Sequence, residues 1–314
     1  MPRRAGKSLF DRRSENEDGS SSWVHQSSGH LPLLSLLMRF RLTFLFLSLG
    51  ALLLAGCTGA SSTSTSSSTD SSTTESPTTT TLVATTSSTT TTIANLPLSG
   101  KVIAIDAGHN GGNAAHSAEI NQLVDAGNGV TKACDTSGTA TNDGYPEYEF
   151  TLSVAKDLQA LVEAQGAKVV MVRNDSAGWG PCITQRAKVG NDAHADIAIS
   201  IHGDGNDAAG TRGFHVLVPQ TTNVNAAVAP ASNRFGILLR DSFLTTGMPV
   251  SNYLGTNGIM PRGDLGGLNL STVPKVFIEC GNMRNATDAS MMRSAAFQQS
   301  AASAIDAAIV QFLS

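Results

Sequence analysis

Residues 101–112 read KVIAIDAGHNGG, a short apolar run that ends in His109 and a cluster of glycines. The same arrangement occurs twice more, in ISIHGDG around His202 and in VFIECGN around Glu279. Apolar runs of this length are typical of buried parallel strands, and such strands carry the side chains at their carboxyl ends to one cleft. The sequence therefore predicts an α/β domain with a functional site at the carboxyl edge of its sheet.

The rest of the pattern alternates between strands and helices. Runs rich in Val and Ile predict strands at Lys101–Asp106, Lys168–Val172, Asp196–Ile201, Gly213–Val218 and Lys275–Cys280. Helical periodicity predicts helices at 147–165, 183–193, 232–245 and 294–313. We expect a mostly parallel central sheet covered by helices on both faces, in a single catalytic domain.

Composition divides the chain into four segments. Residues 1–37 are polar and unlike any usual leader, which indicates that the true start is Met38. Residues 38–56 have the arginines, apolar core and small-residue end of a secretory signal, and they are too short for a comfortable membrane-spanning helix. Residues 57–95 are almost entirely Ser and Thr and predict a disordered tether. Residues 96–314 are long enough for one α/β domain with a sizeable core.

The signal segment closes in the sequence LAGC, whose last residue is Cys57. This motif resembles the lipobox of bacterial lipoproteins, which implies that Cys57 becomes the acylated first residue of the mature protein. The alternative is an ordinary secretory signal that is cut near the same place. With the lipobox, we expect the domain to be anchored to the membrane through a lipid on Cys57, on the outer side of the cytoplasmic membrane or in the cell wall.

From residue 96 onward the chain carries 14 Lys and Arg against 19 Asp and Glu, a formal charge of −5. Nucleic-acid binding requires clustered positive charge, and none is visible in this sequence. We therefore expect no nucleic-acid partner, and we expect the domain to be a monomer.

Two histidines and a carboxylate make the ligand set of a hydrolytic zinc ion (Zn2+) with one open position, and a further carboxylate could act on its water. His109 and His202 are the candidate imidazoles, while Glu147 and Glu149 compete for the third position. On a helix that begins after Pro146, Glu147 lies on the side of the apolar stripe and Glu149 lies on the opposite side. Glu147 thus points inward, although it could equally serve only as a helix cap. The pattern indicates a metallohydrolase.

Four segments resemble the blocks of the zinc-dependent N-acetylmuramoyl-L-alanine amidases of the Amidase_3 family, in their usual order: KVIAIDAGHNGG, EYEFTLSVAKDLQALVEAQGAKVVMVR, ADIAISIHGDG and PKVFIECGNMRN. The resemblance covers residues 99–314 and implies a zinc ion on His109, Glu147 and His202, with Glu279 as the catalytic carboxylate. It also implies that the substrate is peptidoglycan or its muropeptides, cleaved at the amide between the lactyl group of N-acetylmuramic acid and L-alanine of the stem peptide.

Two other classes of function share these residues. A cell-wall-binding lipoprotein could keep the fold without turnover, although binding alone does not require the full set of two His and two Glu. Another zinc amide hydrolase, such as a peptidase or a sugar deacetylase, would use the same metal chemistry. Identifying the bond that is cut in purified muropeptides separates these functions.

The four cysteines have different expected roles. Cys57 is the expected acylation site, and Cys280 lies in a predicted strand, where a cysteine most often behaves as a small buried apolar residue. Cys134 and Cys182 remain, both in loops. Because exported proteins work in an oxidising compartment, we predict a disulfide between Cys134 and Cys182.

Other polar residues near these motifs are expected to have supporting roles. Asp106 is expected to hydrogen-bond a ligand imidazole or the backbone at the end of its strand. His116, His194 and His215 lie in a polar loop, near a helix end and inside a strand, and each is expected to be structural or exposed.

Overall fold

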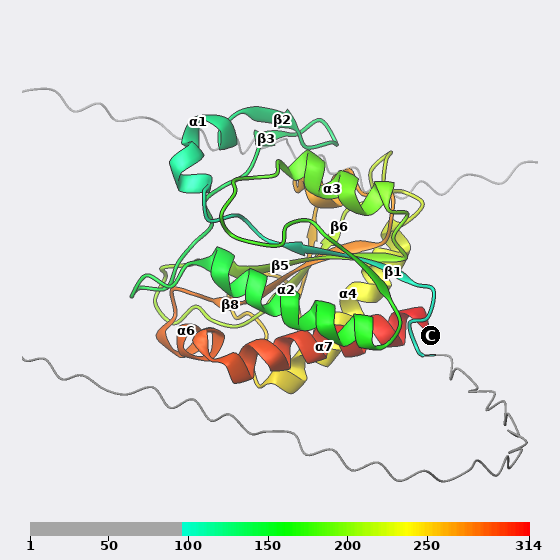
Figure 1. Cartoon of the computed structure of the whole chain (residues 1–314). Helices are drawn as coiled ribbons and strands as arrows, with labels where there is room; N and C mark the ends of the chain where they lie inside the picture. Colours follow the sequence, from blue (N-terminus) through cyan, green and yellow to red (C-terminus); the bar gives the residue numbers. More distant parts are fainter. Residues whose placement is uncertain (1–95) are drawn as a thin grey trace, which may run out of the picture. The chain divides into compact units, whose positions relative to one another are not determined.

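The structure, a computed structural model, describes residues 96–314, which form one α/β domain (Figure 1). The predictions for the leader, the signal, the tether and Cys57 lie outside the described residues and stay predictions. Within residues 96–314, no helix combines the length and the apolar character that crossing a bilayer requires.

A six-stranded sheet in the order β4-β1-β5-β8-β6-β7 forms the centre of the domain. Its strands are β1 (Val102–Ala107), β4 (Lys168–Met171), β5 (Ile197–Asp204), β6 (His215–Pro219), β7 (Ile259–Arg262) and β8 (Lys275–Asn282). All neighbouring strands are parallel except β6 and β8, which are antiparallel. The predicted mostly parallel sheet is therefore confirmed.

Three long helices lie below the sheet in the view of Figure 1: α2 (Glu147–Ala164), α4 (Ala229–Phe243) and α7 (Ala295–Leu313). Helix α2 packs on β1 and β5, α4 packs on β6 and β8, and α7 packs against both helices. The opposite face carries α3 (Ile183–Asp192) and the short α5 (Gly266–Asn269), which pack against each other. Helices thus cover both faces, as predicted.

The two faces of the sheet differ in chemistry because side chains alternate along each strand. On β5, Ile197, Ile199 and Ile201 are fully buried in the main hydrophobic core, on the face that α2 covers. Burial of each such side chain stabilises the fold by roughly 1.5–3 kcal/mol. The opposite face of the same strand carries Ser200 and His202, which are polar. One face therefore supplies stability, and the other is available for a site.

Helix α2 is amphipathic, and its apolar side determines which way its first residue points. Phe150, Val154, Leu158 and Val162 recur every four residues and are fully buried against the sheet. The spacing places Glu147 on the same inward side, where it is buried, while Glu149 is exposed. The inward direction predicted for Glu147 therefore agrees with the structure.

Several elements are not part of the predicted pattern. They are η1 (Asn113–His116), α1 (Ser117–Ile120), β2 (Leu123–Asp125), β3 (Thr131–Ala133), η2 (Leu244–Thr246), α6 (Ala286–Arg293), and the strand β7 and helix α5 given above. Strands β2 and β3 pair as an antiparallel hairpin. Strand β7 is a four-residue edge strand that contains Pro261, a composition that carries little strand signal.

Candidate active site

The candidate residues meet at the carboxyl ends of the central strands. His109 follows β1, while His202 and Glu279 are paired in register on the neighbouring strands β5 and β8. Glu147 is the first residue of α2, the helix that lies below the sheet in Figure 1, and it lines the same hollow as His109, His202 and Glu279. Parallel strands bring their carboxyl ends to one edge, so residues more than 150 positions apart become neighbours.

His109, Glu147 and His202 form a compact group. The Oε1 atom of Glu147 lies 3.3 Å from Nε2 of His109 and 3.0 Å from Nδ1 of His202. One ligand atom from each of the three residues lies within 4.8 Å of the others, which is close enough for all three to hold one metal ion. The donor set of two imidazoles and one carboxylate fits a catalytic zinc ion with an open position.

Two glycines allow the three residues to approach this closely. A Cβ atom on Gly108 would lie 2.3 Å from Cε1 of His202, so any other residue there would displace that imidazole. A Cβ atom on Gly138 would lie 2.8 Å from Oε2 of Glu147 and 2.8 Å from Cδ2 of His109. Gly138 also has a φ of +75°, a conformation that side chains other than glycine rarely adopt.

Glu147 is held by backbone donors in addition to the imidazoles. Its Oε2 accepts a hydrogen bond from the Thr139 amide at 2.9 Å, and its Oε1 accepts one from the Gly203 amide at 3.1 Å. Burial opposes ionisation of Glu147, but the imidazoles of His109 and His202 outweigh that effect and hold its pKa well below the usual range. The carboxylate is therefore a fixed negative charge at the centre of the site.

The second nitrogen of His109 contacts the segment that follows Cys134. Its Nδ1 lies 3.0 Å from the backbone oxygen of Thr136 and 3.4 Å from Oδ1 of Asp135. Because a carbonyl oxygen can only accept, Nδ1 must carry the proton, and Nε2 is left facing Glu147. Burial lowers the pKa of His109, but the charge of Glu147 and the hydrogen bond to Asp135 outweigh it and raise the pKa to about 10. The site thus favours positive charge at this position, the sign of a metal ion.

The second nitrogen of His202 leads to Asp106 through a serine. Nε2 of His202 lies 3.1 Å from Oγ of Ser200, and that hydroxyl donates to Oδ2 of Asp106 at 3.0 Å. Asp106 was expected to bond a ligand imidazole or the strand-end backbone, and it does neither directly. Because Asp106 lies one strand away from His202, on β1, the hydroxyl of Ser200 bridges them. Because that hydroxyl already donates to Asp106, it can only accept from Nε2 of His202, and Nδ1 faces Glu147.

Glu279 lies beside this group with a different environment. Its Oε2 is buried and has no hydrogen-bond partner among residues 96–314. Burial raises the pKa of Glu279 well above its usual value, and the charges of Glu147 and Asp204 raise it further. His215 of β6 is the register partner of Glu279 in the antiparallel β6–β8 pair. It is buried, as expected for a structural residue.

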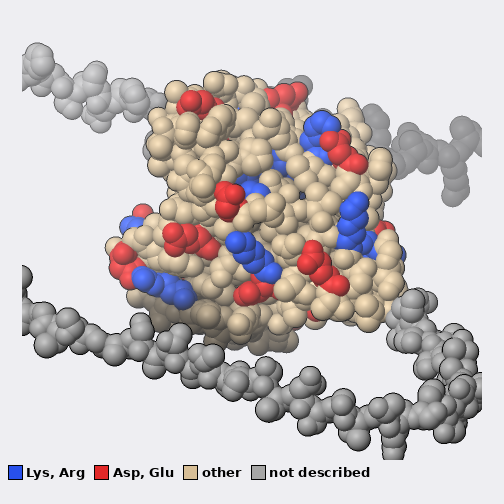
Figure 2. All heavy atoms as spheres, viewed as in Figure 1, with Lys and Arg blue, Asp and Glu red and all other residues tan. Residues whose placement is uncertain are grey.

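Two hollows open beside the candidate residues. One, of about 220 Å³, is lined by Glu279 and the three candidate ligands. The other, of about 430 Å³, shares His109 and His202 with the first, and its lining includes Ile183, Leu265 and Phe277. The larger hollow lies over the polar face of the sheet, beneath the β2–β3 hairpin and α3, and it falls in the size range of small-ligand sites. On the face of the domain drawn in Figure 2, acidic and basic side chains are interspersed.

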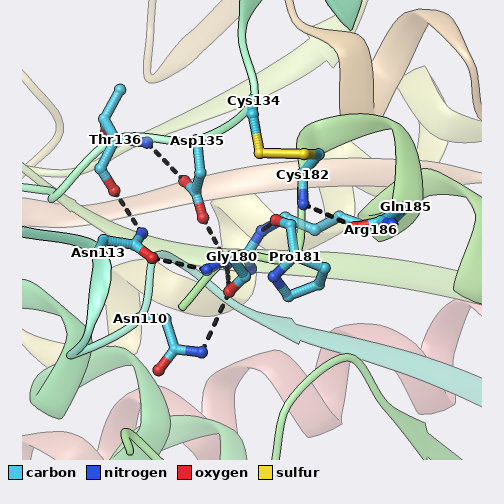
Figure 3. Close-up of a disulfide and its surroundings, with 10 residues drawn as sticks. All are labelled: Asn110, Asn113, Cys134, Asp135, Thr136, Gly180, Pro181, Cys182, Gln185 and Arg186. Atoms are coloured by element: carbon cyan, nitrogen blue, oxygen red, sulfur yellow. Dashed lines mark hydrogen bonds and ion pairs between the residues drawn. A yellow bond between two sulfur atoms is a disulfide. The ribbon is translucent and has the colours of Figure 1, made fainter. Parts of the chain in front are cut away.

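The predicted disulfide between Cys134 and Cys182 is present. It joins the end of the β2–β3 segment to the residue that precedes α3, and Figure 3 shows Asp135 and Arg186 beside it. Cys280 is a free, buried cysteine of β8, as expected.

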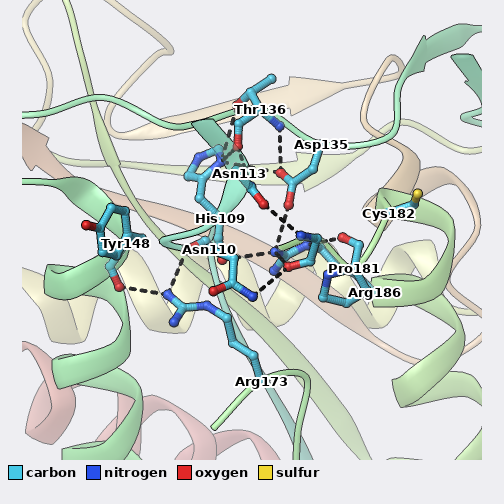
Figure 4. Close-up of polar contacts among 12 residues, drawn as sticks. His109, Asn110, Asn113, Asp135, Thr136, Tyr148, Arg173, Pro181, Cys182 and Arg186 are labelled. Atoms are coloured by element: carbon cyan, nitrogen blue, oxygen red, sulfur yellow. Dashed lines mark hydrogen bonds and ion pairs between the residues drawn. The ribbon is translucent and has the colours of Figure 1, made fainter. Parts of the chain in front are cut away.

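Arg186, on α3, lies at the site but was not predicted from the sequence. Its guanidinium is buried and forms ion pairs with both Asp106, at 2.7 Å, and Asp135, at 2.9 Å. Figure 4 shows it among the residues that support His109. The sequence holds one signal for this arrangement: Asp135 follows Cys134 directly, and Arg186 lies one helical turn after Cys182, so a disulfide brings the two charges together.

The other predicted histidines lie outside the group. The ring of His116 stacks on Trp179 in the loop region beside η1, with ring centres 5.4 Å apart. His194 follows α3 and has a φ of +47°, which places it at the turn that ends the helix. Neither is in contact with the candidate ligands in the described part of the chain.

Comparison with known proteins gives a consistent result. Residues 103–311 match the profile of the Amidase_3 family, described as N-acetylmuramoyl-L-alanine amidase. The chain is 39% identical over 216 residues to the N-acetylmuramoyl-L-alanine amidase Rv3717 of Mycobacterium tuberculosis, a match that covers 69% of this chain and 88% of that protein. It is 40% identical to the crystal structure of the amidase Ami1 from Mycobacterium smegmatis, with a TM-score of 0.65 over 70% of this chain and 99% of that one. The structure of Ami1 from Mycobacterium abscessus is equally similar, with 40% identity and a TM-score of 0.65 over 69% of this chain and 100% of that one.

Proposed function

Because this chain belongs to the Amidase_3 family of N-acetylmuramoyl-L-alanine amidases, we propose that it is a peptidoglycan hydrolase that uses a zinc ion. The bond cleaved is the amide between the lactyl group of N-acetylmuramic acid and L-alanine of the stem peptide. The observation that carries the proposal is the convergence of His109, Glu147 and His202 at the carboxyl edge of the sheet, with Glu279 beside them.

The three proposed ligands suit a catalytic metal for a physical reason. With Nδ1 of His109 bonded to Thr136 and Nε2 of His202 bonded to Ser200, the other nitrogen of each imidazole faces the ionised carboxylate of Glu147 and would lose its proton to bind a metal. A zinc ion held by these residues would supply Lewis-acid chemistry, lowering the pKa of a water to about 7 and polarising the carbonyl of the scissile amide. Glu147 and His202 lie on α2 and β5 and His109 lies in the turn directly after β1, so all three are held by elements of the core before substrate binds.

Glu279 is proposed to be the general acid and base. Hydrolysis of an amide requires removal of a proton from the attacking water and delivery of a proton to the leaving amine nitrogen. Glu147 and Glu279 have opposite pKa shifts, downward for the first and upward for the second, although they line the same hollow. Such a divergence supports different roles for the two carboxyl groups, with Glu147 as a charged ligand and Glu279 as the group that exchanges a proton.

The larger hollow beside the ligands is proposed to receive part of the substrate. Its lining combines the apolar side chains of Ile183, Leu265 and Phe277 with Lys132 at the hairpin. Apolar walls fit the methyl groups of the lactyl and alanyl units. Substrate affinity is proposed to come from this cleft.

We also propose that the enzyme works outside the cytoplasm. An amidase acting on peptidoglycan must reach the cell wall, and the segment that precedes the domain has the composition of an export signal and a Ser/Thr tether. Lipid attachment at Cys57 would keep the domain at the membrane surface, and the tether would extend it toward the wall. The disulfide between Cys134 and Cys182 is consistent with an oxidising compartment.

The decisive experiment replaces Glu279 by Gln in the full chain. Gln has nearly the same shape but cannot accept the proton of the attacking water, so release of stem peptide from purified muropeptides should fall by about 10²- to 10⁴-fold. Zinc content and the melting temperature should stay close to those of the wild type. The matched control is Glu149→Gln, the same change at an exposed glutamate in the first turn of α2, which points away from the candidate site.

Each alternative function gives a different result in this experiment. A wall-binding protein without turnover would release no stem peptide even as wild type. A peptidase or sugar deacetylase would release a different product, which mass spectrometry of the muropeptides identifies. A Glu279→Gln protein that retains zinc and full activity would refute the role proposed for Glu279.

A further inference from the structure

Arg186 occupies an unusual position for a charged residue. It is only 6% exposed, and its guanidinium contacts two carboxylates that lie on different segments, Asp106 of β1 and Asp135 of the loop after β3. The distances are 2.7 Å from Nη1 to Oδ1 of Asp106 and 2.9 Å from Nη2 to Oδ2 of Asp135. A buried arginine of this kind requires a complete set of partners, because a buried charge without them is strongly unfavourable.

Each of these two carboxylates leads to one of the proposed ligands. Oδ1 of Asp135 lies 3.4 Å from Nδ1 of His109, and the backbone oxygen of the neighbouring Thr136 accepts a hydrogen bond from that nitrogen. The other oxygen of Asp106 accepts from the hydroxyl of Ser200, which in turn contacts Nε2 of His202. The two imidazoles are therefore oriented from behind by two separate chains of contacts that both end at Arg186.

Arg186 also holds the backbone that presents His109. Its Nη2 donates to the backbone oxygens of His109 and Gly180 at 3.0 Å, and its Nη1 donates to that of Ala107 at 3.0 Å. His109 has a φ of +56°, a left-handed conformation that is costly for a residue with a side chain. Hydrogen bonds on both sides of Gly108 keep the chain in this conformation, which turns the imidazole back toward Glu147.

We infer that Arg186 is a positioning residue that sets both histidines in the orientation required for the metal, acting through Asp106 and Asp135. The inference rests on the metal site proposed above and deepens it. Arg186 itself is not in contact with the candidate ligand atoms. Its role is to fix, through one rigid planar group, the relative placement of two ligands that come from different strands, and the residues that support metal ligands typically control metal affinity.

The geometry explains why an arginine is needed here. A guanidinium offers five N–H donors in a fixed plane, so that it can bond two carboxylates and several carbonyl oxygens at once. A lysine offers a single ammonium group on a flexible stem and can approach only one of the two aspartates closely. Lys275 illustrates this, since its ammonium contacts Asp106 at 3.3 Å and forms no ion pair with Asp135 among the described residues.

The test compares Arg186→Lys with the wild type in the full chain. The main measurement is the zinc dissociation constant, obtained by competition with a chromogenic chelator, and the second is the visible absorption spectrum of the Co²⁺-substituted protein. We expect zinc binding to weaken by about 10- to 100-fold, the range usual for residues behind metal ligands, and the cobalt spectrum to change. Lysine keeps the positive charge, so a loss in this variant reports positioning and not charge alone.

Two further variants separate positioning from loss of stability. Arg212→Met is the matched control, because Arg212 pairs with the fully buried Asp288 away from the candidate ligands. It should lower the melting temperature without changing zinc affinity. Ser200→Ala interrupts only the branch to His202, so it should weaken zinc binding by a smaller factor than Arg186→Lys. Combined with Arg186→Lys, it should add less than its separate effect, because both changes act on the same branch.

The outcomes distinguish this inference from the proposed function. If the wild type binds no zinc, the proposed metal site is wrong. If the wild type binds zinc and Arg186→Lys binds it within twofold of the wild type, with an unchanged cobalt spectrum, Arg186 is not a positioning residue. The same conclusion follows if Arg212→Met weakens zinc binding as much as Arg186→Lys, since the effect would then come from general destabilisation.

Discussion

Removing the disulfide should lower the free energy of unfolding of the domain, by an amount that depends on the number of residues between its two cysteines. Cys134 and Cys182 are 48 residues apart, and in the chain-entropy model a crosslink over a loop of that length stabilises the folded state by about 4 kcal/mol. For a domain of 150–250 residues, each kcal/mol corresponds to about 2–4 °C in melting temperature, so the expected loss is about 8–16 °C. Replacement of both cysteines by Ala is preferable to Ser, because Cys134 is fully buried and a hydroxyl there would add a desolvation penalty.

The assay is thermal unfolding of the double variant and of the oxidised wild type, both in excess chelator. The chelator is needed because a metal ion that binds only the folded state would add its own stabilisation. Reducing agent should lower the midpoint of the wild type to near that of the variant, and the variant itself should be insensitive to it. Equal midpoints for variant and oxidised wild type would refute the reasoning, and a reductant effect on the variant would show that the assay reports something other than this bond.

The same variant tests a local consequence. Asp135 and Thr136 follow Cys134 directly, and Thr136 contacts Nδ1 of His109. If the disulfide acts only on the unfolded chain, zinc affinity of the folded variant should equal that of the wild type. If it also holds the segment 134–136 in place, zinc affinity should fall together with stability.

Three other outcomes are expected. Glu147→Ala should lose zinc and abolish hydrolysis, whereas Glu149→Ala should keep both, as measured by metal content and stem-peptide release, and the reverse result would show that the wrong carboxylate was chosen. Burial raises the pKa of Asp106, but the charge of Arg186 outweighs burial and holds the pKa below its usual range. The stability from this ion pair is present above the unfolded pKa of about 4 and is lost as pH falls through the lower folded pKa. The urea midpoint of the metal-free protein should therefore fall in acid, and it should fall less for Asp106→Asn. Cys57→Ser should move the exported protein from the membrane fraction to the soluble fraction, and a variant that stays as firmly bound as the wild type would contradict lipid attachment.

The sequence predicts the central part of the fold because that part is determined by local pattern. The strands that became β1, β5 and β8 are continuous apolar runs, and such runs are stable only in the interior of a sheet. Glu147 was separable from Glu149 by helical geometry alone, since the buried stripe of α2 fixes which side faces the sheet. Local periodicity therefore gave both the scaffold and the direction of one candidate ligand.

The supporting residues could not be predicted in this way, because their partners are distant in sequence. Arg186 lies 80 positions from Asp106 and 51 from Asp135, and no periodic pattern links them. Local sequence pattern also could not predict the antiparallel direction of β6 or the presence of β7. The apolar run His215–Pro219 is compatible with either strand direction, and its pairing with neighbouring strands decides the orientation. What the sequence leaves open is thus mostly the set of non-local polar contacts.

The division between the two faces of the sheet explains how the domain tolerates such a polar site. Arg186, Lys275 and Asp106 are all buried beside the polar face, and burying charged groups contributes little net stability even when they are paired. Stability must then come from the opposite face, where the isoleucines of β1 and β5 pack against α2 in the main hydrophobic core. Changes on the apolar face should therefore affect unfolding more than zinc affinity, and changes such as Ser200→Ala should do the opposite. The two properties can be varied separately because adjacent residues of one strand point to different sides.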